Sequence, residues 1–103
     1  MNNFNTMMQQ AQKLQKKIQQ AQEMLEKMDI EGNSGGGMVK VVVTGGLVFK
    51  SVKIDPQVVD PQDVEMLEDL VLAAITDASK KAEETRNAEI GKVTGGVKIP
   101  GLI

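Results

Sequence analysis

Three lysines near the N-terminus are the residues whose type and spacing most clearly suit the binding of a ligand. Lys13, Lys16 and Lys17 fall within about one helical turn of one another, and no Asp or Glu occurs before Glu23. Seven Gln lie between residues 9 and 22. Ammonium and amide groups both donate hydrogen bonds to anionic oxygens, so this segment could contact a polyanion. The simpler alternative is a solvated helix face built from good helix formers.

The charge of the chain is unevenly distributed. Residues 1–28 carry a net +2, residues 29–63 carry −2, residues 64–90 carry −4 and residues 91–103 carry +2, which sum to the −2 of the whole chain. Such asymmetry indicates a charged partner more than the small total does. The chain has a single Arg and only two aromatic residues, Phe4 and Phe49. Any contact with nucleic acid should therefore be mainly to phosphates, with little base stacking or sequence specificity.

Catalytic and metal-binding side chains are scarce. The chain contains no Cys, His, Trp or Tyr, which excludes disulfides, thiolate nucleophiles, imidazole bases and Cys/His zinc sites. Its glycines match neither a phosphate-binding P-loop nor a dinucleotide-binding fingerprint. We therefore expect no enzyme activity, no metal, no cofactor and no small-molecule substrate.

The N-terminal segment is polar and Gln-rich, unlike a signal peptide, and no run of 18 apolar residues occurs. These features predict a cytoplasmic protein with no membrane partner.

A long helix is predicted for residues 4–28. Apolar residues recur there at alternating spacings of three and four, which form a heptad seam. The seam consists of Phe4, Met7, Ala11, Leu14, Ile18, Ala21, Leu25 and Met28. Twenty-five helical residues span roughly 37 Å, more than the ~33 Å diameter of a compact chain of this length. The helix should therefore project from the body or pair with another helix.

An antiparallel sheet is predicted next. Residues 38–44 and 47–54 are rich in Val and flank Gly45-Gly46, which we expect to supply the positive φ of a tight hairpin turn. Alternation places Val48, Lys50, Val52 and Ile54 on one face of the second strand and Phe49, Ser51 and Lys53 on the other. Residues 29–33 could add a third, short strand.

A second helix is predicted over residues 60–90, with Asp60 as N-cap and Pro61 as its first residue. Its apolar positions should form the core or a dimer interface. They are Val64, Leu67, Leu70, Val71 and Ala74. Residues 91–103 should form a flexible tail. The result is a single α+β domain of residues 1–103, in which a projecting helix (1–28), a sheet (29–55) and a second helix (60–90) precede the tail. Because one helix leaves a face of the sheet uncovered, we expect a homodimer.

Four motifs, in this order, resemble the YbaB/EbfC family of nucleoid-associated DNA-binding proteins over nearly the whole chain. They are MMQQAQKLQ (7–15), GGGMVKV (35–41), VKIDP (52–56) and DVEMLEDL (63–70), and the closing Gly95-Gly96 and Ile99 to Leu102 also match.

The resemblance implies a homodimer that binds double-stranded DNA through projecting helices and acts in nucleoid organisation and gene regulation. It implies contacts on the first and last helices. Carried onto this chain, these are Lys13, Lys16, Lys17, Lys80, Lys81 and Arg86. An alternative is a prefoldin-like interaction or chaperone module, whose exposed Met and Leu would hold apolar segments.

Overall fold

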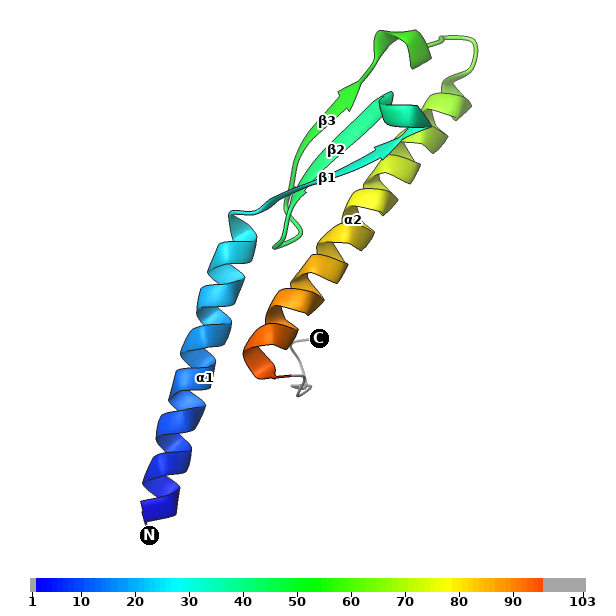
Figure 1. Cartoon of the computed structure of the whole chain (residues 1–103). Helices are drawn as coiled ribbons and strands as arrows, with labels where there is room; N and C mark the ends of the chain where they lie inside the picture. Colours follow the sequence, from blue (N-terminus) through cyan, green and yellow to red (C-terminus); the bar gives the residue numbers. More distant parts are fainter. Residues whose placement is uncertain (1, 96–103) are drawn as a thin grey trace.

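The computed structural model describes residues 2–95, and their order is helix, sheet, helix (Figure 1). Helix α1 (Asn2–Glu26) leads into strands β1 (Asp29–Ser34), β2 (Val39–Thr44) and β3 (Phe49–Ile54), and helix α2 (Val64–Thr94) follows. A short 3-10 turn at Gly35–Gly37 joins β1 to β2, and another at Pro56–Val58 lies between β3 and α2. The predicted α+β class and the third strand are confirmed, whereas the predicted tail lies outside the described residues from position 96 on.

The sheet is antiparallel in the order β1-β2-β3, and α2 packs on β1 and β2. Alternation along β2 buries Val39, Val41 and Val43, each 0% exposed. The residues of α2 that meet them are small, so the helix lies close to the strands. They are Ala74, Ala78 and Ala82, also fully buried. These six residues form the core of the body.

Strand β1 is held against α2 by polar contacts as well as by packing. The Asn33 N–H donates to Asp77 Oδ2 at 3.0 Å, and the Ser34 hydroxyl donates to the carbonyl of Leu70 at 2.6 Å. Gly32 lies so close to Ala78 that a Cβ would be 2.3 Å from its backbone nitrogen. The helix therefore protects an edge strand that would otherwise expose unpaired backbone groups.

The two helices pair over only part of their length. Ile18, Ala21 and Leu25 are buried against Ile90 of α2, in a second cluster apart from the sheet core. The first half of the predicted seam has no such cover, since Phe4 is 68% exposed. The N-terminal half of α1 thus projects beyond the body (Figure 1), and the molecule measures 74 × 20 × 17 Å.

The predicted ends of both helices need correction. Helix α1 ends at Glu26 instead of residue 28. Helix α2 starts at Val64, because Asp63 is its N-cap and accepts a bond from Met66 N, whereas Asp60 caps a preceding turn through Gln62 N. The helix also runs through Gly91 to Thr94, so residues 91–94 belong to it and not to the predicted tail. The left-handed cap is Gly95, with φ 63°.

The hairpin also differs from its prediction. The positive φ falls on Leu47 (68°), and neither Gly45 nor Gly46 has one. A bulge shifts the register so that Phe49 pairs with Val43. Phe49 therefore lies on the same face as Val52 and Ile54, contrary to simple alternation.

Candidate functional site

Three predicted lysines lie on the surface of α1, near the point where its projecting half meets the segment that packs on α2. Lys13, Lys16 and Lys17 are all exposed, and none forms an ion pair within residues 2–95. Helical geometry puts Lys13 and Lys17 on one flank of the buried seam and directs Lys16 away from the seam. We call these three residues the arm lysines. Their ammonium groups are free to meet an anionic partner.

A groove of about 380 Å³ runs between α1 and α2 on the flank of Lys17. Lys17 and Gln20 line it from α1, and Glu89 and Lys92 line it from α2. The Lys92 ammonium lies 3.1 Å from Glu89 Oε1, yet its side chain stays 72% exposed. Sequence reasoning missed Lys92 because it assigned this residue to a tail. The longer α2 puts it beside the arm.

Lys81 makes contacts that join α2 to β1. Its ammonium lies 3.0 Å from Asp77 Oδ2 and donates to the carbonyl of Glu31 at 3.4 Å. The hydrogen bond from Asn33 N–H, and then the bond from Lys81, hold the pKa of the Asp77 carboxyl below its ordinary value of 3.8. Lys81 and Asp77 thus connect α2 to β1, and the Lys81 charge is engaged by partners of its own chain.

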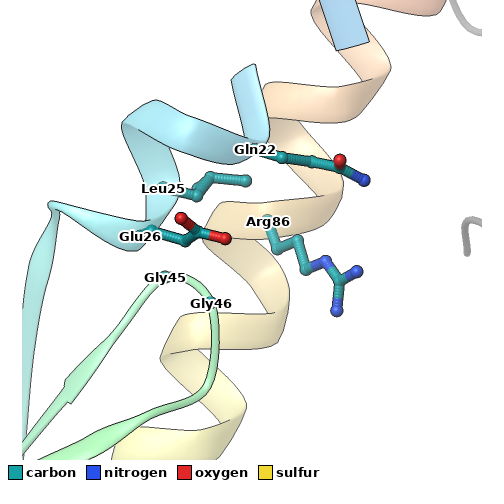
Figure 2. A pocket seen from close by; sticks show the side chains of 6 residues that line it. All are labelled: Gln22, Leu25, Glu26, Gly45, Gly46 and Arg86. Atoms are coloured by element: carbon teal, nitrogen blue, oxygen red, sulfur yellow. The ribbon is translucent and has the colours of Figure 1, made fainter. Parts of the chain in front are cut away.

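The remaining predicted cations lie apart from each other. Lys80 is exposed and lies on the side of α2 away from the buried stripe. Arg86 is half-buried beside Gln22 of α1, on the flank opposite Lys17 (Figure 2). The structure therefore brings Lys17 and Lys92 to one groove, with Lys13 one turn from Lys17 on the same flank of α1, and it separates Lys80 and Arg86 from them.

The predicted interface residues differ widely in burial. Ala74 is fully buried, Leu67, Leu70 and Val71 are partly buried, and Val64 is 52% exposed. Leu67 and Val71 line an open apolar groove of about 430 Å³ that extends along α2 to Ile54 of β3. Only part of this predicted set therefore lies in the core.

Within residues 2–95, no group of three or more Asp or Glu side chains is arranged to hold a metal ion. No helix in that part of the chain is long and apolar enough to cross a membrane. Among the described residues, the exposed lysines of α1 are the feature best suited to an anionic partner, as in a nucleic-acid-binding protein.

Comparisons with known proteins agree with this class. A profile of the YbaB/EbfC DNA-binding family matches residues 1–97. A nucleoid-associated protein of Alkaliphilus metalliredigens is 50% identical over 97% of this chain and 88% of its own length. Nucleoid-associated protein TTE0040 of Caldanaerobacter subterraneus is 52% identical over 97% and 90%.

A solved structure has the same fold. The crystal structure of uncharacterized protein HP0035 from Helicobacter pylori matches with a TM-score of 0.79 and 25% identity, over 89% of this chain and 97% of that one. The chain belongs to the YbaB/EbfC DNA-binding family. The family and the names of these relatives denote DNA-binding, nucleoid-associated proteins and not enzymes.

Proposed function

We propose that this protein binds double-stranded DNA mainly through phosphate contacts, with little sequence specificity, and that it acts at the nucleoid in DNA organisation and gene regulation. The observation that carries the proposal is the exposure of the arm lysines on α1, where its projecting half meets the segment that packs on α2. Lysine is a point charge that recognises phosphate well and bases poorly. Lys92 extends this positive surface onto α2.

We further propose that the active form is a homodimer. Phe49, Val52 and Ile54 pair with buried residues of β2 yet remain 47%, 48% and 39% exposed, because α2 covers the other two strands. The apolar groove on α2 continues this surface, and Leu72 on its rim is 63% exposed. A second copy offers the same strand and groove, as a two-fold symmetric interface requires.

The DNA proposal is tested by gel shift across a salt series. A dimer that uses six arm lysines should show a log–log salt slope of about −5 on duplex DNA. The triple change Lys13→Glu, Lys16→Glu, Lys17→Glu should abolish the shift. A matched control changes Lys27, Lys40 and Lys53 to Glu, which are exposed and alter the net charge equally.

Equal loss in both triple variants would mean that total charge matters and not the arm, and a slope near zero would refute phosphate binding. Suppression of the aggregation of an unfolded client that persists in the arm variant would favour the chaperone alternative. In that case Phe4, Met7 and Met8, exposed on α1, become the contact residues to test.

The dimer proposal is tested by solution mass. The protein should have twice the 11.1 kDa mass of the chain. Leu72→Glu should yield monomers, because it places a charge on an exposed apolar rim without disturbing the core. Val59→Glu is the control, since Val59 is 52% exposed and does not line the groove. A wild-type protein of single-chain mass would refute the proposal.

A further inference from the structure

A charged residue interrupts the buried stripe of α2. Every fourth residue from position 74 to 94 falls on one side of the helix, and all but one of these residues are buried. The buried ones are Ala74, Ala78, Ala82, Ile90 and Thr94. The exception is Arg86, which is half-buried between the sheet core and the α1–α2 cluster. Packing alone would favour an apolar residue at this position.

The Arg86 guanidinium has no partner within residues 2–95, where it forms neither an ion pair nor a hydrogen bond. A guanidinium carries five N–H donors and is always charged, and those of Arg86 are met in the described part of the chain by no protein acceptor, so they stay available to a ligand while the aliphatic stem packs. Its position is better explained by a ligand that accepts hydrogen bonds.

Arg86 lines a pocket of about 260 Å³ where α1, α2 and the β2–β3 turn meet (Figure 2). We call this pocket the junction pocket. It is lined by Gln22, Leu25, Glu26, Gly45, Gly46 and Arg86. A pocket of this volume leaves room for a tetrahedral phosphate and its solvent.

The β2–β3 turn forms one wall of the junction pocket and supplies a further hydrogen-bond donor. A Cβ on Gly45 would lie 2.7 Å from the Leu25 carbonyl, and one on Gly46 would lie 3.1 Å from Glu26 Cγ. Among the N–H groups of residues 45–48, that of Gly46 alone has no acceptor in the described part of the chain. Glycine at these two positions thus lets the turn lie close against α1 at the pocket, beside the free N–H of Gly46.

We propose that the junction pocket binds one phosphate of the DNA backbone. Arg86 would form paired hydrogen bonds to two phosphate oxygens, and the Gln22 amide and the Gly46 N–H would supply the remaining donors. This inference rests on the proposed DNA-binding function. It adds a contact on the flank of the helix pair opposite Lys17, formed partly by a turn that is outside both helices.

Glu26 allows a prediction in which a substitution in the pocket should strengthen DNA binding instead of weakening it. Its carboxylate also lines the junction pocket and would repel a phosphate there. Glu26→Gln should therefore tighten DNA binding, by about fivefold for the loss of one close like charge in water. Glu23→Gln is the matched control: it removes the same charge from an exposed position on α1 that does not line the pocket, and should change affinity by less than twofold.

The experiment uses the full chain, labelled with ¹⁵N and titrated with a short duplex at low salt. The Gly46 amide and the Arg86 Nε–H should shift saturably. Arg86→Met should remove the Gly46 shift, reduce the magnitude of the salt slope by about 1 per chain, and cancel the advantage of Glu26→Gln over Glu23→Gln. Arg86→Lys should retain part of the affinity, since it keeps the charge but not the fork.

Two results would overturn the junction pocket alone: DNA binding through the arm lysines with Gly46 unmoved, or equal effects of Glu26→Gln and Glu23→Gln. A further titration uses inorganic phosphate at the same phosphate concentration. An equal Gly46 shift with it would identify a site for free anions and refute the DNA assignment. A wild-type protein that binds no duplex at all would refute both the pocket and the proposed function.

Discussion

Gly32→Ala tests how closely the sheet and α2 approach each other. The added Cβ would lie 2.3 Å from Ala78 N and 2.6 Å from Ala78 Cα, whereas ordinary van der Waals contact begins near 3.4 Å. The strand and the helix would have to separate by about 1.1 Å, the difference between 3.4 and 2.3. Both opposing atoms belong to the helix backbone, so no side-chain rotation can relieve the clash.

Overpacking of this kind costs about 1–3 kcal/mol, and we expect the upper end because the strain falls on backbone. With Tm falling by about 4–8 °C per kcal/mol in a domain of this size, Gly32→Ala should lower Tm by about 12–24 °C. The assay is thermal unfolding followed by circular dichroism at fixed protein concentration, since dimerisation would make Tm depend on concentration.

Gly91→Ala is the control with the opposite sign. A Cβ there meets nothing within 4 Å, and the residue is helical. The change should raise stability by about 0.5–1 kcal/mol, because Ala loses less conformational entropy than Gly in a helix. The double variant Gly32→Ala, Ala78→Gly should not recover wild-type stability, since the clashing N and Cα atoms remain. A neutral Gly32→Ala, or full rescue by Ala78→Gly, would refute the close approach.

Three further predictions concern other contacts. Asp77→Asn should lower Tm at neutral pH. Because the folded pKa of Asp77 is depressed, the difference in Tm between wild type and variant should shrink as the pH falls below about 3.8 and through that lower folded pKa. A difference in Tm that does not depend on pH would contradict this prediction. Leu47→Gly should stabilise the hairpin by about 1 kcal/mol in urea unfolding, because glycine adopts a φ of 68° without strain, and a loss of stability would show that the Leu47 side chain matters more. Ile90→Ala should cost about 2–5 kcal/mol and speed amide exchange in residues 18–25 of α1, and unchanged exchange there would argue against the helix pairing.

The elements of the fold were predictable wherever one pattern dominated. The heptad seam predicted α1, and Val39, Val41 and Val43 alternate as a half-buried strand does. The predicted start of α2 was wrong because Asp60-Pro61 and Asp63 are both capping signals. Only the hydrogen bond from Met66 N to Asp63 decides between them. The bulge could not be predicted, because a register shift depends on the partner strand and not on local sequence.

The site was predictable to a lesser degree. Exposure of the arm lysines follows from their position off the seam of α1. The engagement of Lys81 does not follow from sequence, since its partners Asp77 and Glu31 meet only once β1 is packed on α2. For Arg86 a signal was present: the four-residue spacing from Ala74 to Thr94 passes through it. The predicted core or interface set of the second helix ended at Ala74, so it did not include that spacing.

Net charge is a poor guide to the partner of so elongated a molecule. Glu65 and Lys92 are 27 residues apart on one helix, which at 1.5 Å per residue is about 40 Å. The Debye length at physiological salt is about 8 Å, so the acidic start of α2 hardly affects the potential at its other end. The arm lysines and Lys92 therefore present a locally positive surface despite the total of −2. Acids close to the cations matter more than the distant ones, as for Glu89, which pairs with Lys92, and Glu26, which shares the junction pocket with Arg86.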